Sequence, residues 1–217
     1  MTELPYSVEV LTATLAAFNT TWWPVVAVGF ASTLWLPFAN SDRHARWMLF
    51  QAAGTAAVVG GPFWLGTMAA LDFMAPVWGG LWLLQAAALL LIGWRGGLDF
   101  TGRGLRGASL VIVAVGALVY PILFQLETGA AGLGVPLAGS APEPTAIVLI
   151  GLLLGARGRR MPAVLLIPAL WAGVAAFNGY LLGLFTPWLV AVTLLAAVAA
   201  RIAARQNEDD TVGEERS

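Results

Sequence analysis

Polar side chains are scarce in this sequence, and the few that interrupt its apolar segments are the first candidates for chemistry. Gln85 is the tenth residue of the apolar segment 76–94, and the others lie near the ends of such segments. Amide and carboxylate groups in these positions can hydrogen-bond to a small polar solute held in an aromatic-lined pocket. The candidate solute-binding residues are Gln85, Asn19, Asn178, Glu127, Asp72 and Gln125.

Each of these residues also has a structural interpretation, and the two interpretations remain open. A buried glutamine such as Gln85 commonly links two membrane helices by a hydrogen bond worth roughly 0.6–2 kcal/mol. Polar residues at helix ends cap the backbone, and tryptophans at a similar depth form the aromatic belt of a membrane protein. The tryptophans concerned are Trp22, Trp23, Trp64, Trp78 and Trp188.

The residues that the sequence lacks exclude several kinds of chemistry. The chain contains no cysteine and no lysine, and His44 is its only histidine. Thiolate catalysis, cysteine metal sites and a retinal Schiff base are therefore excluded, as are haem and zinc sites that need two histidines. No Ser–His pair, aspartate pair or HExxH motif lies in an apolar segment. We expect neither an enzyme, nor a cofactor, nor a metal site.

These residues belong to a chain with the composition of a membrane protein. Hydrophobic residues make up 59% of its 217 residues and charged residues only 11%, whereas an ordinary soluble domain contains about 25% charged residues. A soluble fold of this length has no interior large enough to bury so much apolar surface. The composition therefore excludes water-soluble enzymes, nucleic-acid-binding proteins and disordered regulators, and indicates an integral membrane protein.

The apolar segments predict an all-α fold with seven transmembrane helices. A span needs roughly 20 mostly apolar residues, and the uncharged segment 162–200 is long enough for two, broken near 179–187. A short helix over 7–18 is expected to lie at the membrane surface before the first span. The predicted spans are 21–38, 45–66, 76–94, 108–125, 144–156 and the two halves of 162–200, which together form one polytopic domain over 1–205.

The charged residues orient the predicted helices. All eleven arginines fall after odd-numbered spans or in the C-terminal segment, whereas every charged residue on the opposite side is acidic. Because positively charged loops stay in the cytoplasm, the N-terminus is expected outside and the C-terminus inside. The polar, mostly acidic segment 206–217 is predicted to be a disordered cytoplasmic tail. Moving or deleting one span would break this segregation, which independently supports seven spans.

Prolines mark a similarity between the two halves of the chain. Spans one and five each begin at a proline-containing turn, Trp23-Pro24 and Pro142-Glu143-Pro144, and spans two and six both lead into an outer turn that ends in a proline, Pro76 or Pro187. One interpretation is a pair of parallel three-helix repeats joined by helix four, an arrangement known in transporters. The other is that proline and tryptophan simply favour membrane–water interfaces.

Several short motifs resemble one known family in their order and spacing. They are Leu4-Pro5-Tyr6, Ala17-Phe18-Asn19, Trp23-Pro24, Tyr120-Pro121-Ile122-Leu123, residues 136–145 with Pro142-Glu143-Pro144-Thr145, and Leu166-Ile167-Pro168-Ala169-Leu170-Trp171-Ala172. The chain resembles, over nearly its whole length, the bacterial multi-pass membrane proteins catalogued as domain of unknown function 6064. The resemblance implies a location in the bacterial cytoplasmic (inner) membrane and brings no settled activity.

Two positions depart from the pattern of that family. The family commonly has Gly-His in the outer loop and a cysteine between the two prolines, where this chain has Gly129-Ala130 and Glu143. A metal role that rests on that histidine and cysteine is therefore not expected for this chain.

The positions of the acidic residues narrow the functional classes. Glu127, Asp72 and Glu143 fall at helix ends or in outer turns, so we expect no charge in the membrane core and no proton relay or voltage sensor. The sequence favours a small-solute transporter or channel-like protein without buried charged coupling residues. The alternative is an accessory, sensory or structural membrane subunit that acts through protein partners. The expected partners are the lipid bilayer, an unidentified small polar solute or membrane protein, and further copies of the chain, with no nucleic acid.

Overall fold

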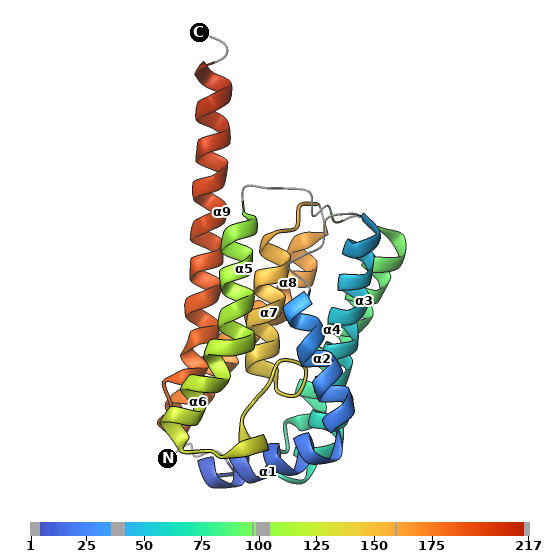
Figure 1. Ribbon diagram of the computed structural model, residues 1–217, viewed down its shortest axis with the longest axis vertical. Helices are drawn as coiled ribbons and strands as arrows, with labels where there is room; N and C mark the ends of the chain where they lie inside the picture. The colour runs from blue at the N-terminus through green and yellow to red at the C-terminus, as the bar shows by residue number, and fades with distance from the viewer. Residues whose placement is uncertain (1–4, 36–41, 97, 99–104, 159, 215–217) are drawn as a thin grey trace.

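The computed structural model describes residues 5–35, 42–96, 98, 105–158 and 160–214. In these ranges the chain is all-α and forms no sheet; a single isolated bridge pairs Ala138 with Ala141. Most helices run along the long axis of an elongated bundle, and α1 lies across one end of it (Figure 1). The all-α prediction is therefore confirmed. Residues 36–38, the end of the first predicted span, lie outside the described ranges.

Among the described residues, five helical segments are long and apolar enough to cross a membrane, and each corresponds to a predicted span. Two shorter apolar helices, α2 (Trp23–Trp35) and α7 (Pro142–Leu154), occupy the positions of the first and fifth predicted spans. The five long segments are α3 (Asp42–Val58) with η2 (Val59–Thr67) and η3 (Met68–Ala70), α4 (Ala75–Arg95), α5 (Arg106–Ala114) with η4 (Val115–Val119) and α6 (Tyr120–Thr128), α8 (Met161–Leu182), and η6 (Thr186–Trp188) with α9 (Leu189–Glu214).

The ends of helix α1 (Val8–Thr21) are defined by its capping residues, and its position is held by three buried side chains. Ser7 precedes it in extended conformation, and its side chain accepts a hydrogen bond from the backbone N–H of Val10, which satisfies one of the free N–H groups of the first turn. Leu15, Phe18 and Asn19 are its buried residues. They attach α1 to the end of the bundle. The sequence also predicts a helix here, over 7–18, and the observed helix extends to Thr21.

Two membrane-length segments widen locally into π-helix, and both do so next to a proline. Pro62 lies inside η2, and Pro121 follows η4 at the start of α6. Proline has no N–H for the regular helical hydrogen bond and its ring crowds the preceding turn, and π stretches often accompany functional positions. Trp64 within η2 and Phe124 in α6 line a common cavity described below.

Helix α7 occupies the centre of the bundle. Every residue in it except Glu143 is buried, and it packs against α5, η4, α8 and α9. Glycines permit the closest approach on the α5 side: a Cβ at Gly116 would lie 2.9 Å from the Pro144 carbonyl, and one at Gly151 would lie 2.9 Å from the Val113 nitrogen. The Ser109 hydroxyl also donates to the Gly151 carbonyl at 2.6 Å. Close backbone contact of this kind is typical of helix packing in membranes.

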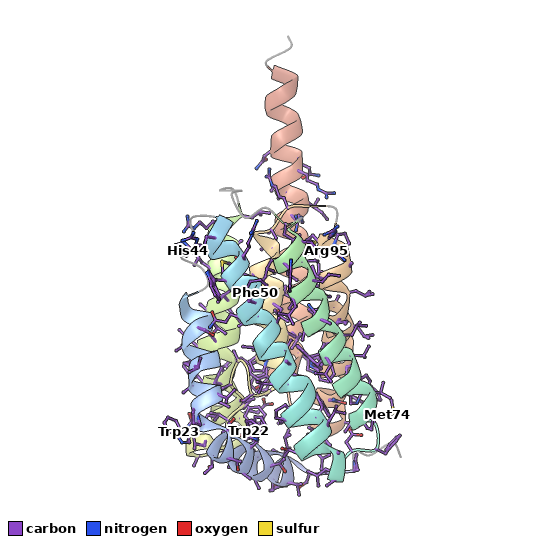
Figure 2. The ribbon with its side chains drawn as sticks, turned by 90° about the vertical axis from the view of Figure 1, so that its right-hand side faces the viewer. Trp22, Trp23, His44, Phe50, Met74 and Arg95 are labelled. Carbon is purple, nitrogen blue, oxygen red and sulfur yellow. The ribbon has the colours of Figure 1, made fainter. Side chains whose placement is uncertain are left out.

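The two ends of the bundle differ in residue type. His44 and Arg95 lie at one end, whereas Trp22, Trp23 and Met74 lie at the other (Figure 2). Helix α9 passes the arginine-bearing end and projects beyond the other helices (Figure 1). It is helical to Glu214, whereas the sequence predicts a disordered tail from residue 206.

Candidate functional site

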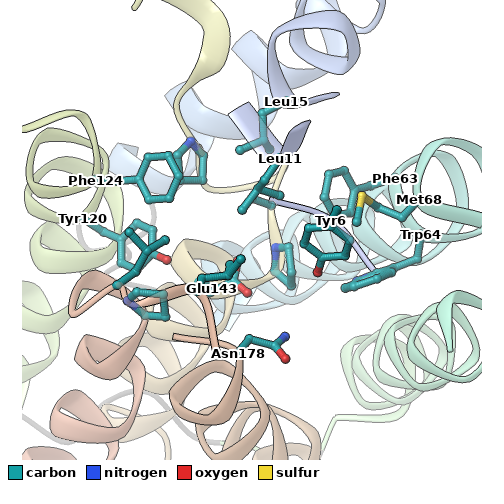
Figure 3. Close-up of a pocket in the computed structure, with 16 residues that line it drawn as sticks. Tyr6, Leu11, Leu15, Phe63, Trp64, Met68, Tyr120, Phe124, Glu143 and Asn178 are labelled. Atoms are coloured by element: carbon teal, nitrogen blue, oxygen red, sulfur yellow. The ribbon is translucent and has the colours of Figure 1, made fainter. Parts of the chain in front are cut away.

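A cavity lies at the end of the bundle that α1 covers, and we call it the α1–α7 cavity. Its volume, counted as space open to the centre of a water molecule, is about 40 Å³, more than the roughly 10–15 Å³ that one water needs. Its walls are mostly apolar and aromatic (Figure 3), and the lining residues with polar side-chain groups are Tyr6, Trp64, Tyr120, Glu143 and Asn178. The lining residues are Tyr6, Leu11, Leu15, Phe63, Trp64, Met68, Tyr120, Phe124, Pro136, Ala141, Pro142, Glu143, Asn178, Leu182, Leu184 and Pro187.

The loop before α7 folds into the bundle and carries the start of α7 with it. Helix α6 ends at Gly129, whose φ of +69° is readily adopted only by glycine. The loop then buries Ser140 completely. Thr145 fixes the connection to α7, because its hydroxyl accepts from the Gly139 N–H at 2.8 Å and donates to the Ala141 carbonyl at 2.6 Å. The first turn of α7 therefore begins among side chains of the other helices.

The Pro142-Glu143-Pro144 sequence suits a helix that starts inside a protein. The first N–H groups of a helix have no intrahelical partner, and a proline at such a position removes one of these donors. Pro142 and Pro144 both lie in the first turn of α7 and are both buried. Glu143 lies between them, where the positive end of the helix dipole favours a carboxylate.

Glu143 is the acidic residue of the α1–α7 cavity. Its side chain is half-buried and lies between Tyr6, Tyr120 and Asn178 (Figure 3). The indole of Trp171 lies beside the carboxyl group, although its N–H makes no regular hydrogen bond. The cavity thus combines one carboxyl group with phenol and amide groups inside an aromatic wall.

Tyr6 closes the cavity from the segment that precedes α1. Burial, together with the negative charges of Glu143 and Asp72, raises the pKa of the Tyr6 phenol above its usual value. The phenol therefore remains protonated at neutral pH and can donate a hydrogen bond into the cavity.

A tryptophan cluster lies next to Glu143 and consists of Trp64, Trp78, Trp82 and Trp171. The rings of the other three each meet the Trp171 ring in an edge-to-face geometry, with centroids 5.7 Å apart in each pair; such pairs contribute about 0.5–1.5 kcal/mol each beyond their burial. Within the described part of the chain, the indole N–H groups of Trp64, Trp82 and Trp171 are buried without a hydrogen-bond partner. Since Trp64 lines the cavity, its N–H is available to an acceptor on a bound molecule.

Of the six solute-binding candidates predicted from the sequence, only Asn178 lines the cavity. Gln85 is fully buried in α4, and its amide donates to the Val164 carbonyl of α8 at 3.0 Å. Its side-chain oxygen has no hydrogen-bond partner among the described residues. Gln85 therefore links two helices, in agreement with the structural interpretation of this residue.

Two other candidates, Asn19 and Asp72, hold a loop or a turn in place. The Asn19 amide, which is buried, donates to the carbonyls of Leu133 and Val135 at 2.7 and 3.0 Å. The carboxylate of Asp72 accepts from the Met74 N–H at 2.8 Å, which closes the turn before α4. A third candidate, Gln125, has an exposed side chain near the end of α6. The role of these three residues in solute binding remains a prediction, and the contacts of Asn19 and Asp72 identify structural tasks.

Glu127, the remaining candidate, joins the end of α6 to the turn between α8 and α9. Its carboxylate accepts from the backbone N–H groups of Phe185 and Thr186 at 2.6 and 3.0 Å and from the Thr186 hydroxyl. A carboxylate at the start of a helix satisfies free N–H groups and interacts favourably with the helix dipole. Glu127 is thus a helix-capping anchor beside the cavity.

The residues that sequence reasoning missed are Glu143, Tyr6 and Tyr120. The sequence predicts Glu143 in an outer turn, whereas the structure places it inside the bundle on the wall of the cavity. The available signal was the pair of flanking prolines, which is unusual at the start of an apolar helix. No group of three potential metal ligands occurs among the described residues.

The chain matches no protein-family model, no curated protein and no solved structure. The candidate function therefore depends on the geometry of the site itself.

Proposed function

We propose that this multi-pass membrane protein is a small-solute transporter or channel-like protein that binds its solute in the α1–α7 cavity. The observation that carries the proposal is the position of Glu143, a carboxyl group held inside the bundle in an enclosed aromatic cavity. Ionisable groups inside a membrane bundle are functional candidates because their burial is costly, and pockets with apolar walls and a few convergent polar groups are typical binding sites.

The lining of the cavity defines the chemistry of the solute. Glu143 favours a group that donates hydrogen bonds or carries a positive charge, and the rings of Tyr6 and Tyr120 can face such a cation. The Asn178 amide adds one donor and one acceptor. The small volume, about 40 Å³, favours a solute of a few non-hydrogen atoms.

The proposed topology keeps the seven predicted spans. The five long helices supply five of them, and α2 and α7 supply the other two. The arginine-bearing end then faces the cytoplasm and the α1–α7 cavity faces outward. Membership in the bacterial family that the motifs resemble, the inner-membrane location and the pair of three-helix repeats remain parts of this proposal, as does the absence of an enzymatic activity.

The alternative is a membrane subunit that acts through a protein partner. One observation favours it: α9 projects beyond the other helices at the arginine-bearing end (Figure 1). A subunit of this kind would show no solute uptake when reconstituted alone.

Uptake by the purified protein in liposomes tests the proposal. Radiolabelled methylammonium, acetamide and glycerol serve as probes of a cationic, an amide and a hydroxyl solute. We expect saturable uptake of methylammonium above protein-free liposomes, reduced about tenfold or more by Glu143→Gln, because a hydrogen bond to a charged group contributes about 1.5–3 kcal/mol. Glu9→Gln is the matched control, since Glu9 is an exposed carboxyl group at the same end.

Two outcomes of this experiment contradict the proposal. Uptake of none of the three probes by the folded protein would favour the subunit alternative. Uptake that Glu143→Gln and Glu9→Gln leave equally intact would remove the α1–α7 cavity as the binding site.

A further inference from the structure

A second pocket lies at the opposite end of the bundle, and we call it the arginine pocket. It is formed where α9 passes the start of α5 and the loop that follows α7 (Figure 1). Its volume is about 260 Å³, several times that of the α1–α7 cavity. The lining residues are Leu105, Arg157, Gly158, Arg201, Ala204 and Arg205.

Three arginines converge on this pocket. Arg201 and Arg205 lie one turn apart on α9, and both Arg205 and Arg157 are close enough to Arg201 to interact with it electrostatically. Arg201 is half-buried, and one of its guanidinium nitrogens donates to the Ala156 carbonyl at 2.6 Å. Its other terminal nitrogen, Nη1, is buried and has no hydrogen-bond partner among the described residues.

The described residues that line the pocket carry charges of one sign, those of Arg157, Arg201 and Arg205. Its lining contains no carboxylate among the residues that the structure describes, and like charges four residues apart on a helix repel. Leu105 contributes the start of α5, where no side chain caps the helix and where free N–H groups and the helix dipole favour an anion. An anion bound between the arginines would relieve this repulsion and pair with the free Nη1 group.

The pocket borders a surface suited to lipid. Leu195, Val198 and Ile202 of α9 lie within two turns of Arg201 and have exposed side chains. An apolar helix face next to a basic pocket fits a molecule with an acyl chain and an anionic head, and basic pockets between membrane helices bind such headgroups.

We propose that the arginine pocket binds a phosphate group, supplied by an anionic phospholipid headgroup or by a free phosphate compound. Arg157, Arg201 and Arg205 would hold the phosphate oxygens, since the planar guanidinium group forms paired hydrogen bonds with phosphate. This site is separate from the α1–α7 cavity and does not depend on the function proposed for that cavity.

Native mass spectrometry of the full-length protein in a neutral detergent tests this proposal. Phosphatidylglycerol, phosphatidylcholine and inorganic phosphate are titrated separately, so that a lipid source and a free phosphate source are distinguished. We expect phosphatidylglycerol to bind more tightly than phosphatidylcholine, and Arg205→Gln to weaken its binding about tenfold. Arg205 is exposed, so its substitution leaves the Arg201 contact to Ala156 intact.

The control is Arg43→Gln, which removes an exposed arginine outside the pocket and is expected to leave binding unchanged. Inorganic phosphate that binds with the same dependence on Arg205 would also support the site and would identify free phosphate as the source. Equal losses in Arg43→Gln and Arg205→Gln would overturn the proposal, because surface charge alone would then explain binding. Glu208, Asp209 and Asp210 follow Arg205 in the acidic C-terminal segment. Binding of phosphatidylglycerol or phosphate that appears only after these three residues are changed to amides would also overturn the proposal.

Discussion

The two ends of α7 present opposite charges in different surroundings. At its N-terminal end the Glu143 carboxyl group faces a small aromatic cavity of about 40 Å³, and just beyond its C-terminal end Arg201 bonds the Ala156 carbonyl beside a pocket of about 260 Å³. Each sign is the one that the helix dipole favours at that end. The thirteen residues of α7 span about 20 Å at 1.5 Å per residue.

This difference shows how one short helix can serve two separate sites. The cavity end is closed by α1 and by aromatic side chains, so we expect it to admit only small solutes. The arginine pocket is wider and is lined by three cations, so we expect it to prefer anions. The position of α7 along the bundle axis fixes both sites at once.

The largest expected effect comes from changing the two glycines at the contact of α7 with the α5–η4 segment. Gly116→Val, in η4, would place side-chain atoms against Ile147 and the Pro144 carbonyl near the cavity end, and Gly151→Val, in α7, would place them against Val113 near the arginine end. Overpacking of this kind costs about 1–3 kcal/mol. Unfolding in a denaturing detergent measures the loss, and Gly173→Val is the control because no atom lies within 4 Å of its Cβ position.

The two glycine variants also sharpen the comparison of the two ends. Gly116→Val is expected to impair the cavity more than the arginine pocket, and Gly151→Val to do the reverse. Equal and small effects of all three valine substitutions would contradict the close packing of α7 against α5.

A smaller loss of stability is expected from substitution of Glu127, which anchors only the cavity end of the bundle. Glu127→Ala leaves the N–H groups of Phe185 and Thr186 without their acceptor, at a cost of about 2 kcal/mol in the free energy of unfolding. Glu127→Gln retains one acceptor oxygen and should cost about half as much. Glu9→Ala, at an exposed carboxyl group in α1, is the control and should leave the free energy of unfolding nearly unchanged. A stability of Glu127→Ala equal to that of the original chain would show that this carboxylate is no anchor.

The smallest effect on stability is expected from substitution of Gln85, which lies midway between the two ends of the bundle. Gln85→Leu removes the hydrogen bond to the Val164 carbonyl, but it also removes a buried side-chain oxygen without a partner, so the two contributions largely cancel. The free energy of unfolding should change by less than about 1 kcal/mol, and uptake should be unchanged. A large loss of uptake at normal stability would restore Gln85 as a solute-binding residue.

The positions of the helical segments and the segregation of the charged residues could be predicted, because hydropathy and arginine placement are local properties of the sequence. The packing of each helix against its neighbours could not be predicted. Helices α2 and α7 are both short, apolar and proline-led, yet Trp23 and Val28 of α2 are exposed whereas α7 is buried on all sides. Which of two similar helices becomes central depends on long-range packing, such as the approach of Gly116 to Pro144 and of Gly151 to Val113.

The candidate site was predicted in part for the same reason. Hydropathy places these polar residues at helix ends, but the sequence does not reveal which of them already has a hydrogen-bond partner. Asn19 and Glu127 bond distant backbone groups, and only contacts across more than fifty residues show it. The sequence predicts Glu143 in an outer turn because its flanking prolines mark an unusual helix start but do not show that residues 129–141 fold back into the bundle.

Reactivity at the cavity tests most directly whether the N-terminal end of α7 forms a site open to small cationic solutes. The chain contains no cysteine, so Asn178→Cys introduces a single thiol on the cavity wall, with Ala131→Cys as an exposed control and Ala146→Cys as a buried one. We expect a small, positively charged methanethiosulfonate reagent added on the side of α1 to modify Asn178→Cys faster than a neutral reagent of similar size, and Glu143→Gln to abolish that difference. A thiol at position 178 as unreactive as the one at position 146, or one indifferent to Glu143, would contradict the account.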